Sequence, residues 1–330
     1  MENHFPGCRE ILRNIYLSQG FPENSIKILI GSLRDSSLKQ YNTYIHQWWT
    51  FCNEYGTNYK EVNLEVVLQF LSHLYEKGLS YSALNTAKCA LCLLSSDRSN
   101  FIGHHPVISR FMKGVFNQRP QMSKYTSTWD VGILLKYLSK LSPLDEISFK
   151  ELSYKLVGLL AVCTAHRVQT FSLLKIHNVT TNVDHIEILV DAVIKTTRPG
   201  SQPIILRLPF LNDRINICPA RTLQQYLKVS ADLRESNDLF VSYKKPLKKV
   251  GTSTISRWIK VLLKDSGIDS NFSSHSTRHA STSHAFQKGV DVEMIRSTAG
   301  WSSCSDVFEK FYNKPFVNNT NLSFAMSVLE

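Results

Sequence analysis

The sequence predicts a mostly α-helical protein of two domains: an N-terminal helical bundle, then a mixed α+β domain with a small antiparallel sheet. Its 330 residues suit two domains better than one. Apolar side chains recur at helical intervals through residues 1–125, where no strand-like alternation occurs. β-Branched runs around a Pro-Gly break occur only in the second half. The best linker is the aperiodic stretch 119–128. We therefore place the domains at residues 1–122 and 123–330.

End signals define the helices of the first domain. Asn63 can cap a helix through its side chain, and Lys77-Gly78 is typical of a helix end. Ser80 and His105 each precede a further apolar-periodic run. The predicted helices span residues 24–33, 37–55, 64–77, 81–94 and 106–118. They predict a bundle of four or five helices.

The second domain combines apolar helical runs with short strands. Helices are predicted at residues 130–141, 148–163, 218–233, 254–263 and 292–298, and strands at 176–179, 185–193 and 204–208. The break at Pro199-Gly200 predicts a hairpin that carries Lys195, a residue type that is usually solvated there. Arg167 stands at a helix start among residues that look buried. A buried arginine needs a carboxylate or an anionic ligand as its partner.

The charge of the chain favours a polyanionic partner. Its net charge is +11 and its isoelectric point is about 9.3. General solubility is the plainer explanation of such a charge. Aromatic and basic residues interleave in the first domain, which fits either core aromatics with solvated lysines or a helical clamp on a nucleic-acid backbone. The interleaved residues are Lys39, Tyr41, Tyr44, Trp48, Trp49, Lys88, Arg110 and Lys113.

Several classes of protein are disfavoured. The seven cysteines are odd in number and scattered, which is typical of a reduced intracellular protein without disulfides. Cys89 and Cys92 form a lone pair within a helical run, which argues against zinc. The chain shows no signal peptide, membrane-spanning run, Walker A loop, His-Glu-x-x-His motif or carboxylate cluster for Mg²⁺. We expect no metal and no membrane.

The stretch from His275 to Tyr312 carries the strongest chemical pattern. His275 and Arg278 lie three positions apart, so on a helix they share a face and can both donate to one phosphate. Trp301 follows Gly300, and Tyr312 ends the next helical run, where its hydroxyl is a candidate nucleophile. Each piece alone is commonplace, as a capping pair or as core aromatics. Together they predict phosphoryl transfer through a covalent protein intermediate.

These residues, with two upstream ones, resemble the motif of the tyrosine recombinases, or phage-type integrases. That motif has an arginine, a hairpin lysine, His-x-x-Arg, Gly-His or Gly-Trp, and a tyrosine, in this order. The matching catalytic residues are Arg167, Lys195, His275, Arg278, Trp301 and Tyr312. The resemblance covers roughly residues 20–315. The sequences CTAHRVQTFSLL and AGWSS…FEKFYNKP look most like recombinases of eukaryotic mobile elements.

The resemblance implies a function. Tyr312 would attack a DNA phosphate clamped by Arg167 and Arg278, and Lys195 would protonate the leaving oxygen. His275 and Trp301 would add donors. No metal or nucleotide cofactor is implied, because the phosphotyrosine keeps the bond energy for rejoining. The implied partners are double-stranded DNA and further copies of the chain, usually a tetramer on DNA. The location would be intracellular, and the nucleus in a eukaryotic host.

Two departures from the motif keep an alternative open. Thr170 stands where family members often carry an acidic residue. Trp301 and Tyr312 are eleven positions apart, slightly more than is usual in the family. Each additional helical residue turns a side chain by about 100°, so the placement of Tyr312 is the point at issue. The alternative is a DNA-binding protein derived from a recombinase that has lost catalysis. A metal-dependent nuclease is disfavoured by the missing carboxylates.

Overall fold

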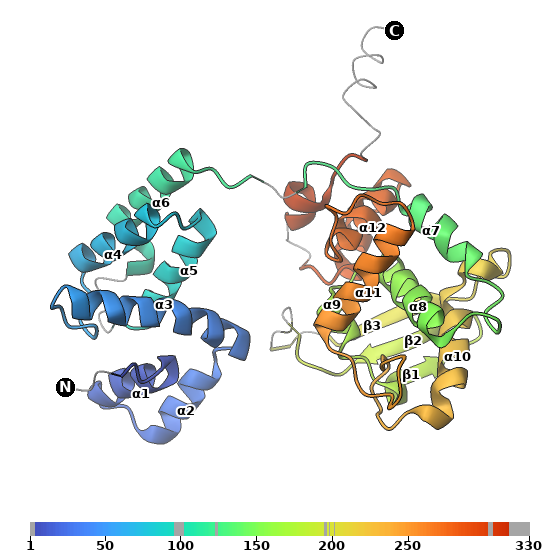
Figure 1. The fold of residues 1–330 in the computed structure, drawn as a ribbon, viewed down its shortest axis with the longest axis horizontal. Coiled ribbons are helices and arrows are strands. Elements are labelled where there is room, and N and C mark those ends of the chain that lie inside the picture. Colours follow the sequence, from blue (N-terminus) through green and yellow to red (C-terminus); the bar gives the residue numbers. More distant parts are fainter. Residues whose placement is uncertain are drawn as a thin grey trace, which may run out of the picture. The chain divides into compact units, whose positions relative to one another are not determined.

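The computed structural model describes residues 4–95, 102–122, 125–194, 197, 199–200, 202–302 and 306–316. The chain divides into two compact units, Met1–Lys124 and Tyr125–Glu330. Helices dominate both, and the second also holds a three-stranded antiparallel sheet (Figure 1). The predicted fold class is therefore confirmed.

Six α-helices form the described part of the first unit, rather than the four or five predicted. They are α1 (Cys8–Ser18), α2 (Glu23–Gly31), α3 (Asp35–Glu54), α4 (Leu64–Glu76), α5 (Tyr81–Cys92) and α6 (Pro106–Gln118). The missed helix is α1, whose N-cap residue Gly7 has no side chain to cap it. Its apolar side chains Ile11, Leu12 and Ile15 are nevertheless buried. Tertiary packing therefore stabilises this helix in the absence of a side-chain cap.

The cap predicted at Asn63 is confirmed, and the helix start predicted at Ser80 is capped in the same way. Asn63 Oδ1 accepts from the Val66 amide at 2.9 Å, and Ser80 Oγ accepts from the Ala83 amide at 3.3 Å. Trp48 is fully buried and its indole N–H donates to the Tyr59 carbonyl at 2.9 Å. That aromatic residue belongs to the core, as the plainer interpretation held.

In the second unit, α8 lies at the centre. It packs against α7, α10, α11, α12 and β3 (Figure 1), and a capping box between Ser148 and Glu151 begins it. The helices are α7 (Val131–Lys140), α8 (Phe149–Thr164), α9 (Val168–Phe171), α10 (Pro219–Ser230), α11 (Thr252–Asp265), α12 (Ser276–Gln287) and α13 (Val292–Thr298). Because α8 is buried on nearly all sides, the elements packed on it have fixed positions.

The sheet has the order β1-β2-β3, with β1 at Val179–Thr181, β2 at His185–Val190 and β3 at Ile204–Pro209. Ile186 pairs with Leu208, and Ile188 with Leu206, so alternate side chains of β2 enter the core. The strand predicted at 176–179 begins only at its last residue, Val179. Its first three residues form a 3₁₀ turn, because the Ile176 amide donates to the Asn237 carbonyl at 2.9 Å rather than to the sheet. Lys195, predicted on the hairpin, lies outside the described residues.

Within the described residues, no helix combines the length and the apolar character needed to cross a bilayer.

Candidate active site

The helix α12 places the His-x-x-Arg pair. His275 is the residue before its first turn, and Arg278 lies in that turn with a side chain only 1% exposed. One guanidinium nitrogen, Nη1, donates to the Ala165 carbonyl at 2.8 Å. Ala165 ends α8 in the left-handed region with φ 51°, a conformation that costs energy for a residue with a side chain. The end of α8 thereby anchors the arginine of α12.

The other guanidinium nitrogens of Arg278, Nε and Nη2, are buried without a hydrogen-bond partner among the residues that the structure describes. Burial, followed by the nearby charge of Arg167, lowers the pKa of Arg278 to about 10, so it is still charged at neutral pH. Across the described ranges, neither arginine forms an ion pair with a carboxylate. The salt-bridge explanation of Arg167 therefore finds no support, and the two cations together favour an anionic ligand.

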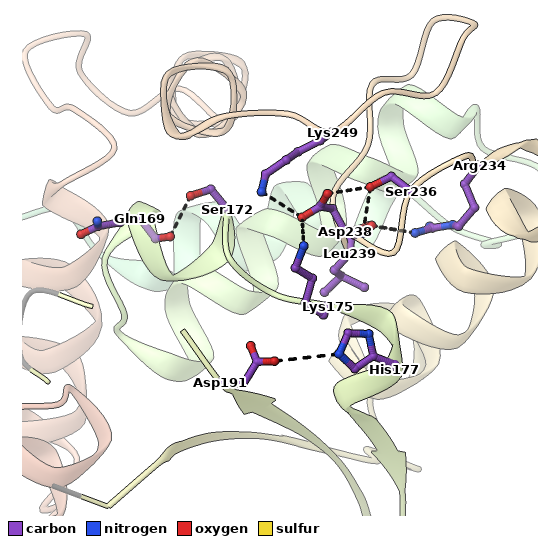
Figure 2. Close-up of polar contacts among 10 residues, drawn as sticks. All are labelled: Gln169, Ser172, Lys175, His177, Asp191, Arg234, Ser236, Asp238, Leu239 and Lys249. Carbon is purple, nitrogen blue, oxygen red and sulfur yellow. Dashed lines mark hydrogen bonds and ion pairs between the residues drawn. The ribbon is translucent and has the colours of Figure 1, made fainter. Parts of the chain in front are cut away.

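Arg167 is held at the start of α9, and a polar network fixes the chain that follows that helix. Figure 2 shows Asp238 at its centre. This carboxylate accepts from Lys175 at 2.7 Å and from Lys249 at 3.0 Å. Burial alone would raise the pKa of Asp238, but hydrogen bonds from Lys175, Ser236 and Lys249 bring it down to about 2. The network anchors the segment after α9.

Tyr312 ends a π-helical turn, Phe308–Tyr312, that packs against α12. Its hydroxyl is 3.2 Å from Nε2 of His275. The guanidinium carbon of Arg278 is 5.4 Å from the centre of its ring and 4.3 Å from that of Trp301. Within the described ranges, the Trp301 indole N–H is also buried without a partner. The structure thus brings together four of the predicted residues: His275 contacts the Tyr312 hydroxyl, and Arg278 and Trp301 lie against the Tyr312 ring.

The longer interval before Tyr312 does not remove it from this group. The Asn313 amide donates to the Phe308 carbonyl at 2.8 Å, five residues back. A π-turn holds more residues than an α-turn, so it takes up additional sequence length. Tyr312 thus ends a helical run, as predicted, and the run is a π-helical turn. Thr170, which stands where family members often carry an acidic residue, has a buried side chain in α9.

Two histidines of this region were not singled out from the sequence. His166 is buried beneath Gly300, where an added Cβ would lie 3.4 Å from its ring. Burial, then Arg278 and Arg167, lower the pKa of His166 to about 4. His279 stacks on the Tyr312 ring, with centroids 4.2 Å apart. The available signal was adjacency, since each histidine is the immediate neighbour of a motif arginine.

Comparison with known proteins finds a matching family and similar folds. The model of the phage integrase family matches residues 135–318. The structure is similar to the XerH site-specific recombinase bound to palindromic difH substrate (TM-score 0.63, 15% identity, 99% of this chain and 98% of that chain). It is also similar to the Tn1549 transposon integrase in complex with transposon right-end DNA (TM-score 0.59, 13% identity, 98% of each chain).

A third similar structure is a lambda integrase dimer bound to a COC′ core site (TM-score 0.52, 16% identity, 89% of this chain and 94% of that chain). No curated protein gives a sequence match. At these identities the structural matches show the fold, and the family assignment rests on the matched residues 135–318, which are more than half of the sequence. The chain belongs to the phage integrase family of tyrosine recombinases.

Proposed function

We propose that this protein is a site-specific DNA recombinase, which cuts and rejoins double-stranded DNA through a phosphotyrosine formed at Tyr312. One observation carries the proposal. Arg278 and Trp301, whose buried donors have no partner among the described residues, lie against the ring of Tyr312, and His275 contacts its hydroxyl, in a site that two uncompensated arginines make positive. A phosphodiester offers the acceptor oxygens and the negative charge that this site lacks.

The proposed chemistry follows from this arrangement. The Tyr312 oxygen attacks the phosphorus, and His275, at 3.2 Å, is placed to exchange the phenol proton. Arg278 and Arg167 stabilise the charge that grows on the non-bridging oxygens. Lys195 is the proposed general acid for the leaving 5′ oxygen. The phosphotyrosine ester stores the energy of the broken bond, so rejoining needs neither a metal nor a nucleotide.

The wider assembly is part of the proposal. Residues 1–122 would act as the DNA-binding clamp and 123–330 as the catalytic domain. The net charge of +11 supports contact with DNA. Solved structures with this fold include a lambda integrase tetramer bound to a Holliday junction (TM-score 0.51), which supports a tetramer on DNA here. We further propose that the chain comes from a eukaryotic mobile element and acts in the nucleus. The sequences around its motif residues support this proposal, because they resemble those of eukaryotic mobile-element recombinases.

Trapping on a suicide substrate tests the function. A selection for bound DNA sequences first supplies a target site. A nick near the scissile phosphate then lets the leaving fragment diffuse away, so that covalent adducts accumulate. We expect adducts from the wild-type protein in the presence of EDTA and none from Tyr312→Phe, with equal DNA affinity. Adducts that require Mg²⁺ would indicate a nuclease, and DNA binding without adducts would indicate a derived DNA-binding protein.

A further inference from the structure

The face of α12 that meets Tyr312 is a continuous stripe. His275, His279 and Ser283 are spaced four residues apart, so they lie along one side of the helix. Each contacts the tyrosine residue at a different place. His275 reaches the hydroxyl, His279 the ring and Ser283 the backbone. Only the first of these residues belongs to the motif.

Ser283 holds the backbone of the turn. Its hydroxyl donates to the Tyr312 carbonyl at 2.7 Å and accepts from the Lys314 amide at 3.0 Å. The side chain is fully buried. One hydroxyl thus satisfies two backbone groups on either side of Asn313, where the π-turn ends and its last carbonyl would otherwise be unpaired.

His279 holds the ring. Its plane is tilted by only 14° from that of Tyr312, and the centroids are 4.2 Å apart. The Tyr125 ring also meets the His279 ring edge-on, with centroids 5.7 Å apart. Its Nδ1 is buried and has no hydrogen-bond partner in the described part of the chain. Burial, then His275 and Lys314, lower the pKa of His279 to about 4. The stacked ring is therefore neutral at physiological pH.

We propose that His279 and Ser283 are positioning residues that hold Tyr312 ready for attack, an inference that rests on the recombinase function proposed above. The turn that carries Tyr312 has five residues. Without these contacts the Tyr312 hydroxyl would sample many positions. Cleavage is faster when the nucleophile is held close to the phosphate in the orientation for attack. The effect concerns the free tyrosine. Once its oxygen is bonded to phosphorus, the covalent bond itself fixes the position.

This difference gives the test. Cleavage on the suicide substrate is compared with religation, in which a supplied 5′-hydroxyl strand attacks the preformed phosphotyrosine. The variants are His279→Leu, which removes the ring, His279→Phe, which keeps a ring to stack, and Ser283→Ala. For His279→Leu we expect cleavage about three- to tenfold slower, the size of one lost aromatic pair, with religation and DNA affinity unchanged. His279→Phe should cleave close to the wild-type rate. Ser283→Ala should also slow cleavage alone.

Matched controls carry the same changes elsewhere. His73→Leu alters a histidine packed on Phe51 in the first unit, and Ser153→Ala removes a buried hydroxyl that donates to the Phe149 carbonyl at 2.6 Å. Both should leave the ratio of cleavage to religation unchanged. Wild-type cleavage in His279→Leu and Ser283→Ala, or an equal loss of cleavage and religation, would overturn the inference while leaving the recombinase function intact. Failure of the wild-type protein to form adducts would overturn both.

Discussion

Replacing Arg278 with methionine should separate stability from function. Arg278 is buried, but its charge meets no carboxylate in the described part of the chain, and two of its nitrogens have no partner. A residue held for structure would be paired. We therefore expect Arg278→Met, which keeps the length of the side chain and removes its charge, to abolish cleavage and to leave the fold almost as stable.

The magnitude follows from three contributions. Burial and the neighbouring Arg167 lower the pKa of Arg278 from 12.5 to about 10, which at 1.36 kcal/mol per pKa unit makes the charge cost about 3 kcal/mol. The variant is relieved of this cost. It loses a charged hydrogen bond to Ala165, worth about 1.5–3 kcal/mol, and the contact with the Trp301 ring, worth about 1 kcal/mol. The free energy of unfolding should therefore stay within about 2 kcal/mol of the wild-type value.

Two assays check this. Urea denaturation at pH 7 gives the free energy of unfolding, and suicide-substrate trapping gives the cleavage rate, which should fall by roughly 10²–10³-fold or more. A loss of about 3–5 kcal/mol in stability would refute the reasoning, because that is the cost of breaking a buried, paired charge. Cleavage at the wild-type rate would remove Arg278 from the active site.

Three further predictions concern lysines and a carboxylate. Lys195→Ala should be slow on normal DNA but largely rescued by a substrate with sulfur at the bridging 5′ position, whose leaving group needs little protonation; slow cleavage of both substrates would exclude a general acid. Asp238→Asn should cost about 1–3 kcal/mol at pH 7, and urea titrations should show this difference vanishing as the pH falls from about 4 to about 2, where the folded carboxylate with its lowered pKa is finally protonated. Burial lowers the pKa of Lys155 from 10.5 to about 8, so the unfolded state retains a proton that the folded state has released. Between about pH 8 and pH 10.5, the free energy of unfolding of the wild-type protein should therefore rise with pH relative to that of Lys155→Met. Free energies of the two proteins that change in parallel over this pH range would contradict the lowered pKa of Lys155.

Local signals predicted much of the fold. Asn63 and Ser80 cap helices as expected, because an N-cap depends only on a side chain and the next three amides. Residues 292–298 form the predicted helix α13, and Asp291 caps it. The motif spacing likewise placed His275 beside Arg278, since three positions on a helix bring two side chains to one face.

Features set by distant contacts were not predictable in this way. The π-turn that carries Tyr312 is hydrogen-bonded by Ser283, 29 positions earlier in the chain. His279 stacks on Tyr312 although nothing in the local sequence pairs the two. Ala165 adopts a left-handed conformation that its residue type disfavours, and its carbonyl accepts from Arg278. In each case the conformation depends on contacts between residues far apart in the sequence. All three cases lie at the candidate active site.

The most direct test of the central claim is the identity of the residue bonded to DNA. The trapped adduct is digested with nuclease and protease, and its peptides are sequenced by mass spectrometry. The proposed function predicts one modified peptide, with a nucleotide 3′-phosphate esterified to the Tyr312 oxygen. A nucleotide on any other residue, or no modified peptide from a protein that binds its site, would contradict the claim.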